Sequence, residues 1–412
     1  MTKMSKMFTQ AENLSGLGPA REWLQDPGYR SDEVAAIARP RNAATLHTTR
    51  SSSIHSNRLV YVTTGRGDIT PVRIADPEPL EEGWVLGEFK SGTVCSTDKS
   101  NAHSILGHAI PTDKPKIIGH EACYEVVGSR HPGVPEGSFI VTLGDDWHGF
   151  AERETFWPVL PSTDPNEIPL AFCERATYFD PVSQVKAICI FDEWFSGASL
   201  IEPITHVVTS FLSSRQLMFA NTVLVLGAGF CGQAACLVAK MLGATKVTVM
   251  DMNRDRVDFA IRHGFADEGF DPAHESSMDL IIQKTRGAYV DTVFDALPGI
   301  ASESPDTRSL AAQLLRPGGV WTMYSAAKRM TVPAITLLAR GIHISGAPYD
   351  SRMITFSKRA SIMSLVHSLI RSGRIPVDLF ISHWIDFFDE QAVSQSILEY
   401  GCGPQIKVEI RR

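Results

Sequence analysis

The fold is decided by the stretch Asn221–Arg256, NTVLVLGAGFCGQAACLVAKMLGATKVTVMDMNRDR. Its Thr222–Leu226 segment is a short run of Val and Leu, which is typical of a strand buried on both faces. A glycine turn follows, and after it comes Gln233–Leu242, an Ala- and Leu-rich segment with no helix breaker. A second apolar strand, Lys246–Met250, ends at an acidic residue. This order predicts a βαβ unit with parallel strands.

The glycine turn has the spacing of a dinucleotide-binding loop, GxGxxG. In such a loop Gly227 permits the tight turn, Gly229 lets the backbone approach a pyrophosphate, and Gly232 lets the helix pack closely on the strand. Phe230 and Cys231 lie between these glycines and are expected to contact the cofactor. The pyrophosphate would lie at the helix N-terminus, where free N–H groups and the helix dipole favour negative charge.

An acid follows the second strand, because Asp251 lies 19 residues after Gly232. A carboxylate there accepts hydrogen bonds from both hydroxyls of the adenosine ribose. The same carboxylate repels a 2′-phosphate, so the sequence predicts NAD rather than NADP. The alternative is a plain βαβ turn that binds nothing.

Composition excludes several classes of protein. A chain of 412 residues is long for a single domain, so two domains are expected. The 43% apolar and 21% charged fractions describe an ordinary globular protein. A net charge of −7 argues against nucleic-acid and membrane-surface partners. No apolar run reaches the roughly 18 residues that a membrane span needs.

The compartment is predicted from the first residues and the cysteines. The start of the chain has no apolar core of the secretory type. The seven cysteines show no paired spacing, which favours free thiols in a reducing compartment. We therefore expect a cytoplasmic protein.

Three segments are predicted along the chain. Residues 1–57 are polar and irregular, and form either a flexible extension or an arm over a partner subunit or the active-site mouth. Residues 58–205 contain short strands broken by Gly and Pro turns, which indicates a β-rich domain. Residues 206–346 alternate strands and helices, with further strands at Val290–Asp295, Gly319–Tyr324 and Gly341–Gly346 and a helix-to-strand turn at Leu315–Gly319. Residues 347–412 begin with a helix, Phe356–Arg371, and return to the β-rich type. The expected fold is α/β, with a doubly wound Rossmann sheet inserted in a β-rich domain.

A second group of residues has metal-binding chemistry. Cys95, His120, Glu121 and Glu202 offer a thiolate, an imidazole and carboxylates, which suit a cation of the zinc type. Three protein ligands with an open fourth position are typical of a catalytic site. The residue types alone also fit a buried cysteine, a capped histidine and surface acids.

From about Arg58 onward, the chain resembles the medium-chain, zinc-dependent alcohol and polyol dehydrogenases, in the sorbitol and threonine dehydrogenase branch. The resemblance rests on motifs that occur in the family's order: Cys95-Ser-Thr-Asp98, Gly119-His-Glu121, Ile201-Glu-Pro203, the glycine turn, Asp251-Met252-Asn253 with Arg256, Leu315-Arg-Pro-Gly-Gly319 and Ile381-Ser-His383. It implies a GroES-like catalytic domain, a homodimer or homotetramer, and a small-molecule alcohol or ketone substrate.

The resemblance also implies roles for single residues. Cys95 and His120 would bind one catalytic zinc. Glu202 would be a third ligand or would hold zinc-bound water, and Glu121 would be a direct ligand or support the ligands from behind. Asp98 would orient His120 from behind, and Thr97 would hydrogen-bond the substrate oxygen. From the residues alone, Thr97 and Asp98 are equally well explained as a turn cap. Met252, Asn253 and Arg256 would assist Asp251 with the adenosine ribose.

The chain departs from the family pattern in three places. Residues 144–185 hold only Cys173 where many members have a four-cysteine lobe, so no structural zinc is expected. Trp147 and His148 in this segment line a substrate pocket, or the segment packs only on itself. The usual relay histidine is Ser100 here, and His103 either substitutes for it or is a surface residue. The N-terminal extension is the third departure.

The leading functional hypothesis is an NAD-dependent zinc dehydrogenase acting on a secondary alcohol such as a polyol, sugar, cyclitol or amino alcohol. One alternative is an epimerase or lyase that retains NAD and oxidises its substrate transiently. The other is a nucleotide-sensing or structural protein without catalysis, against which the Cys95, His120 and Glu202 set argues.

Overall fold

The protein is described from a computed structural model, which defines residues 56–77, 80–104, 115–143, 150–159, 185–213, 220–272, 289–297, 305–325, 333–346, 354, 356–401 and 406–412. All of these residues belong to one compact unit, Leu46–Arg412. Residues 1–55 of the predicted extension 1–57 lie outside the described residues, as do Trp147 and His148, whereas Ser56 and Asn57 begin a strand, Ser56–Thr63. Among the described residues, no helix combines the length and the apolar character that crossing a bilayer requires.

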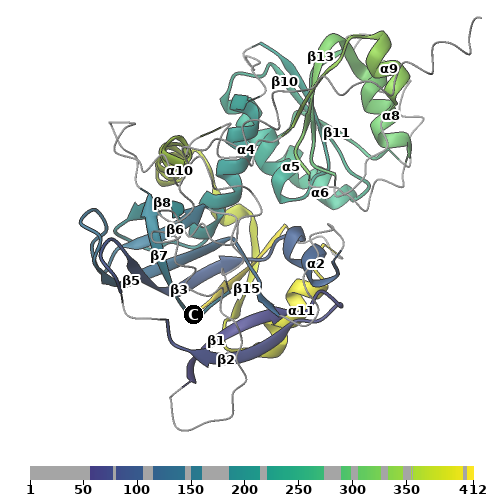
Figure 1. Cartoon of the computed structure of the whole chain (residues 1–412). Coiled ribbons are helices and arrows are strands. Elements are labelled where there is room, and N and C mark those ends of the chain that lie inside the picture. The colour runs from purple at the N-terminus through teal and green to yellow at the C-terminus, as the bar shows by residue number, and fades with distance from the viewer. Residues whose placement is uncertain are drawn as a thin grey trace, which may run out of the picture. The chain divides into compact units, whose positions relative to one another are not determined.

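The stretch Asn221–Arg256 supplies two inner strands of a six-stranded sheet (Figure 1). The strands, in spatial order, are β11 (Glu268–Phe270), β10 (Lys246–Met250), β9 (Thr222–Leu226), β12 (Val290–Asp295), β13 (Leu315–Met323) and β14 (His343–Gly346). All neighbouring pairs are parallel. Numbered within the sheet, the order is 3-2-1-4-5-6, which is that of the Rossmann fold. The predicted α/β fold is confirmed.

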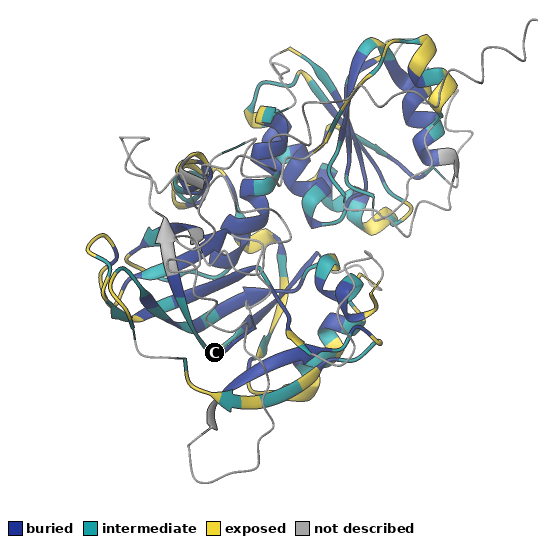
Figure 2. Cartoon of the chain, in the orientation of Figure 1, coloured by how far each residue is buried: buried dark blue, intermediate teal, exposed yellow. Residues whose placement is uncertain are grey.

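Helices cover both faces of this sheet, as its parallel topology requires (Figure 1). They are α5 (Phe230–Met241) and α6 (Arg254–Arg262) on one face, and α8 (Pro305–Leu314) and α9 (Ala334–Ala339) on the other. The strands are therefore among the most buried parts of the molecule (Figure 2).

One turn in this region differs from its prediction. Leu315–Gly319 was expected to form a turn from helix to strand, but β13 already begins at Leu315. The register of β13 against β12 shifts between Leu315 and Val320, so the residues between them bulge out of the ladder. Gly318, at φ 68°, supplies the left-handed backbone within the bulge.

The β-rich region contains a seven-stranded sheet and a three-stranded sheet. The larger sheet has the order β15 (Ile381–Asp386), β16 (Lys407–Arg411), β3 (Val85–Thr93), β5 (Ala122–Ser129), β6 (Phe139–Leu143), β8 (Val185–Phe191) and β7 (Arg153–Val159). The smaller sheet has the order β2 (Thr70–Ala75), β1 (Ser56–Thr63) and β4 (Lys116–Ile117). The last strand of the chain, β16, thus pairs with β3, one of the first.

The remaining helices of the described residues connect or flank these sheets. They are α2 (Ser96–Ala102), α4 (Ile201–Ser213), α10 (Phe356–Arg371) and α11 (Glu390–Leu398), with 3₁₀ turns η2 (Ala198–Leu200) and η4 (Val377–Leu379). The predicted domain boundary at 205/206 falls inside α4. One buried hydrophobic cluster includes residues of β8, α4, α5 and α10, so apolar packing is continuous across that boundary.

Candidate active site and metal centre

Three of the four predicted metal ligands converge. One ligand atom each of Cys95, His120 and Glu121 lies within 4.8 Å of the other two. No second group of this kind occurs in the part of the chain that the structure describes. A thiolate, an imidazole and a carboxylate are the donor set of a zinc site, so the residues present fit that metal.

Cys95 is placed by the start of a helix. It is the N-cap residue of α2, directly after the buried end of β3. The Asp98 carboxylate accepts a hydrogen bond from the backbone N–H of Cys95 at 2.8 Å, closing a capping box. This contact fixes the backbone from which the thiol projects.

The same aspartate also holds His120. The second carboxylate oxygen of Asp98 lies 3.0 Å from Nδ1 of His120, and Asp98 is fully buried. A proton on Nδ1 leaves Nε2 with its lone pair directed elsewhere, which is the arrangement of a metal-binding histidine. Burial alone would lower the pKa of His120, but the Asp98 carboxylate raises it well above its ordinary value. Asp98 is thus both a turn cap and the partner of His120.

His120 and Glu121 lie in a break that the sequence did not predict. β4 ends at Ile117 and β5 begins at Ala122, so His120 and Glu121 lie between two strands of the β-rich region. Gly119 makes the break possible, because its φ is 93° and an added Cβ would lie 2.5 Å from the Phe150 ring. The chain therefore turns here and directs two polar side chains to the metal centre.

Glu121 is held by a buried cation. Its Oε2 accepts hydrogen bonds from Thr93 Oγ1 and Lys407 Nζ, both at 2.5 Å. Lys407 also donates to the carbonyl of Val94 at 3.0 Å. Burial alone would lower the pKa of Lys407, but the adjacent Glu121 carboxylate holds it well above its ordinary value. Burial raises the pKa of Glu121 itself, and the Lys407 charge opposes that rise.

Glu202 approaches the same centre from a helix. It is buried in the first turn of α4, and its charge acts on both His120 and Glu121. Its Oε1 lies 3.0 Å from Nε2 of His206, one turn further along the helix. Burial alone would raise the pKa of Glu202, but His206 lowers it below the ordinary value.

The glycine turn has the geometry that its spacing predicts. Gly227 has a φ of 88°, and an added Cβ on Gly232 would lie 1.7 Å from the Gly227 carbonyl oxygen. Gly229 is the N-cap of α5, and nothing lies within 4 Å of its added Cβ. Of the three glycines of this turn, only Gly229 has open space beside it, at the helix N-terminus where a ligand could bind.

Asp251 is held at the mouth of this turn. Its carboxylate accepts hydrogen bonds from the backbone N–H of Ala228 at 2.6 Å and of Asn253 at 2.7 Å. Asn253 itself caps α6 by accepting from the N–H of Arg256 at 3.3 Å. Met252 is 61% exposed. The acid is thus fixed before any ribose binds.

The glycine turn and the metal centre are in contact. The Phe230 ring, at the start of α5, lies 4.9 Å from the Lys407 ammonium and packs edge-on against Phe380. Cys231 lies close enough to Cys95 for their charges to interact, and burial raises the pKa of Cys231 to about 12. The dinucleotide turn therefore adjoins the proposed ligands.

The remaining predicted residues contribute less. Thr97 is half-buried in the first turn of α2, and its carbonyl accepts from the Asn101 amide at 2.8 Å. His103 is exposed, and its ring lies 3.2 Å from where a Cβ on Gly67 would be.

His206 and Lys407 were not predicted from the sequence, although His206 has a signal there. Glu202 and His206 are four residues apart, which places both on one face of a helix. Lys407 has no such signal, because it is one of three charged residues in the final strand, Lys407–Arg411, and nothing in the sequence distinguishes it from the other two. Its burial beside Glu121 is visible only in three dimensions.

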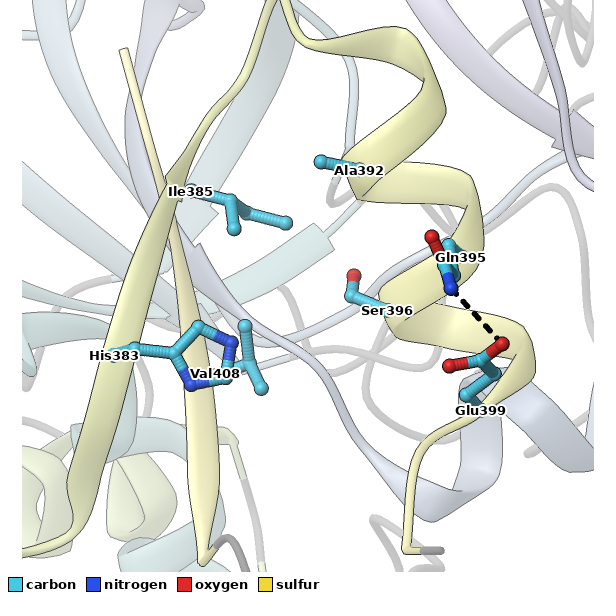
Figure 3. A pocket seen from close by; sticks show the side chains of 7 residues that line it. All are labelled: His383, Ile385, Ala392, Gln395, Ser396, Glu399 and Val408. Carbon is cyan, nitrogen blue, oxygen red and sulfur yellow. Dashed lines mark hydrogen bonds between the residues drawn. The ribbon is translucent and has the colours of Figure 1, made fainter. Parts of the chain in front are cut away.

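A separate cavity of about 230 Å³ lies between β15, β16 and α11 (Figure 3). Ile385, Ala392 and Val408 give it an apolar side, and the Gln395 amide donates to Glu399 at its rim. None of the predicted ligand or cofactor residues lines it.

Comparisons with known proteins agree with this geometry. A family model described as a zinc-binding dehydrogenase matches residues 231–363. Probable D-xylulose reductase A of Neosartorya fischeri is 27% identical over 386 residues, covering 87% of this chain and 98% of the relative.

Solved structures give the same fold. L-idonate 5-dehydrogenase from Escherichia coli superposes with a TM-score of 0.65 at 15% identity, over 86% of this chain and 98% of that chain. Alcohol dehydrogenase TADH from Thermus sp. ATN1 gives 0.64 at 17% identity, over 86% and 99%.

The chain thus resembles the zinc-binding, medium-chain dehydrogenases in sequence and fold, and it is an oxidoreductase. Within that class it is similar to relatives named as reductases and dehydrogenases of alcohols and polyols. These names favour net oxidation or reduction over the epimerase or lyase alternative.

Proposed function

We propose that this protein is an NAD-dependent polyol dehydrogenase that interconverts a secondary alcohol and a ketone at a single zinc. The observation that carries the proposal is the convergence of Cys95, His120 and Glu121 beside the glycine turn. The relatives named D-xylulose reductase and L-idonate 5-dehydrogenase favour a polyhydroxylated substrate.

The proposed ligands are Cys95, His120 and one or both of the two carboxylates. When bound, zinc polarises the substrate oxygen, and the nicotinamide ring exchanges a hydride with the neighbouring carbon. Asp98 keeps Nδ1 of His120 protonated and so orients the ring. Thr97 is the proposed hydrogen-bond partner of the substrate hydroxyl. Burial raises the pKa of Glu121, and the adjacent Lys407 ammonium opposes that rise by favouring the carboxylate.

The cofactor preference is proposed from Asp251. Its carboxylate is already fixed by two backbone N–H groups, so the adenosine ribose hydroxyls meet an immobile acceptor. A 2′-phosphate at that position would meet the same negative charge. Discrimination against NADP therefore requires no rearrangement.

A homodimer is proposed from exposed apolar residues at one edge of the Rossmann sheet. β14 is an edge strand, with Ile344 51% exposed. On α9, Ile335 and Leu338 are 78% and 81% exposed. Pairing of β14 with a second copy would satisfy its open backbone groups and cover this surface.

A cytoplasmic location is proposed from the five free cysteines of the described residues.

The test is a panel of polyols, sugars, cyclitols, amino alcohols and simple alcohols, followed by nicotinamide absorbance with NAD and with NADP. Zinc content is measured on the same preparation. We expect about one zinc per chain and NAD-dependent turnover of a polyol. Absence of zinc, or retention of NAD without net reduction on any substrate, would overturn the proposal.

A further inference from the structure

We propose that His206 is a positioning residue of the metal centre, which fixes the orientation of the Glu202 carboxylate beside the Cys95, His120 and Glu121 group. This inference rests on the proposed zinc-dependent function. Its basis is the pair formed by Nε2 of His206 and Oε1 of Glu202, which are 3.0 Å apart. The side chains of Glu202 and His206 are only 4% and 15% exposed, so water competes little for this contact.

Helix geometry explains why the pair forms. Glu202 and His206 are one turn apart on α4, and helical side chains lean toward the N-terminus of their helix. The imidazole therefore lies over the preceding turn, where Glu202 begins. With Oε1 engaged by His206, the second carboxylate oxygen is the one left for another partner.

The other candidate ligands are oriented in the same way. Nδ1 of His120 is held by Asp98 at 3.0 Å, and Oε2 of Glu121 is held by Lys407 and Thr93. Each of these three side chains thus has a buried partner that fixes its orientation. For Glu202 that partner is His206, whose imidazole orients the carboxylate from the next turn of α4.

Removing the imidazole takes away the neighbour that lies 3.0 Å from Oε1 of Glu202. The buried carboxylate then gains rotational freedom. Ordering that carboxylate again would then oppose zinc binding. Outer partners of metal ligands typically change metal affinity by about 10- to 100-fold, which sets the expected effect.

The experiment measures zinc affinity of the full-length protein by competition with a chromophoric chelator, in the absence of substrate and cofactor. The variants are His206→Ala and His206→Gln, the latter retaining an N–H donor. Ser210→Ala is the matched control, because its hydroxyl donates to the His206 carbonyl on the same helix at 2.8 Å. We expect a loss of about 10- to 100-fold for alanine, partial rescue by glutamine and no change in the control.

A second readout separates positioning from general damage. The Co²⁺-substituted protein should show altered visible absorption in His206→Ala, with an unchanged spectrum in Ser210→Ala. If His206→Ala does not fold, His206→Gln is compared with Glu202→Gln by the same two measurements. If the zinc affinity of His206→Ala is within about twofold of the wild-type affinity, this inference alone is overturned. Failure of the wild type to bind zinc would overturn the proposed function as well.

Discussion

The glycine turn and the metal centre differ in how the chain builds them. The turn and its acid lie within Asn221–Arg256, and their geometry depends on backbone contacts between near neighbours. The metal centre takes side chains from the start of α2, a break between two strands and the first turn of α4. A contiguous backbone site is therefore readable from spacing, whereas a dispersed side-chain site depends on the completed fold.

The largest expected effect is on the turn. Gly232→Ala places a methyl group 1.7 Å from the Gly227 carbonyl, so α5 must separate from β9. We expect a loss of about 5 kcal/mol in unfolding free energy, measured by urea denaturation, and loss of NAD binding. Gly229→Ala is the matched control for stability alone, because nothing in the protein lies within 4 Å of its added Cβ. Equal stability of Gly232→Ala and the wild type would contradict the close packing described.

The equivalent change at the metal centre is Gly119→Ala. Its positive φ and the Phe150 ring 2.5 Å from the added Cβ predict a cost of about 4 kcal/mol. We also expect zinc loss, because His120 is the next residue. Gly137→Ala, with a φ of 80° but open space around it, isolates the backbone contribution. If both variants lose the same stability, the clash with Phe150 has no energetic role.

Lys407→Met removes the cation that faces Glu121. It leaves a buried carboxylate unpaired, so we expect a cost of about 3 kcal/mol in thermal or urea unfolding. Lys246→Met is the control, since its partner Glu268 lies 3.0 Å away in a pair that is about one-third exposed. That surface pair should contribute less than about 1 kcal/mol. If both variants lose a similar unfolding free energy, the buried Lys407 and Glu121 pair contributes no more to stability than the surface pair does.

The smallest expected effect concerns His367, which is remote in sequence from both regions. Its ring stacks on Phe191 and Phe195, and burial followed by the Arg371 charge lowers its pKa. The unfolded chain therefore binds this proton more readily, and stability falls as the pH drops below about 6.5. His367→Phe should flatten that part of the stability profile between pH 7 and pH 5. An unchanged slope would contradict the assignment.

Sequence reasoning was most successful where neighbours along the chain define the structure. The strands of the Rossmann sheet and α10 were predicted to within a few residues, because apolar periodicity and glycine turns are local signals. The break at Gly119 was missed, since residues 117–127 are mostly apolar and nothing in their pattern marks the approach of Phe150. The bulge after Leu315 was missed for a similar reason.

At the metal centre, residue types predicted the ligands but not what holds them. Asp98 could be named as the partner of His120 because its motif, Cys95-Ser-Thr-Asp98, resembles that of the family. Lys407 could not, because it comes from the last strand and is 286 residues from Glu121. The proposed choice between Glu121 and Glu202 depends on partners of this kind.

One paired measurement tests the central claim most directly. Zinc content and NAD affinity are determined on the same preparations of Cys95→Ser and Asp251→Ala. We predict that Cys95→Ser loses zinc and binds NAD as the wild type does. Asp251→Ala should keep zinc and bind NAD about 10- to 100-fold more weakly, as expected for losing a charged hydrogen-bond acceptor. Full zinc content in Cys95→Ser, or unchanged NAD affinity in Asp251→Ala, would contradict the two-site assignment.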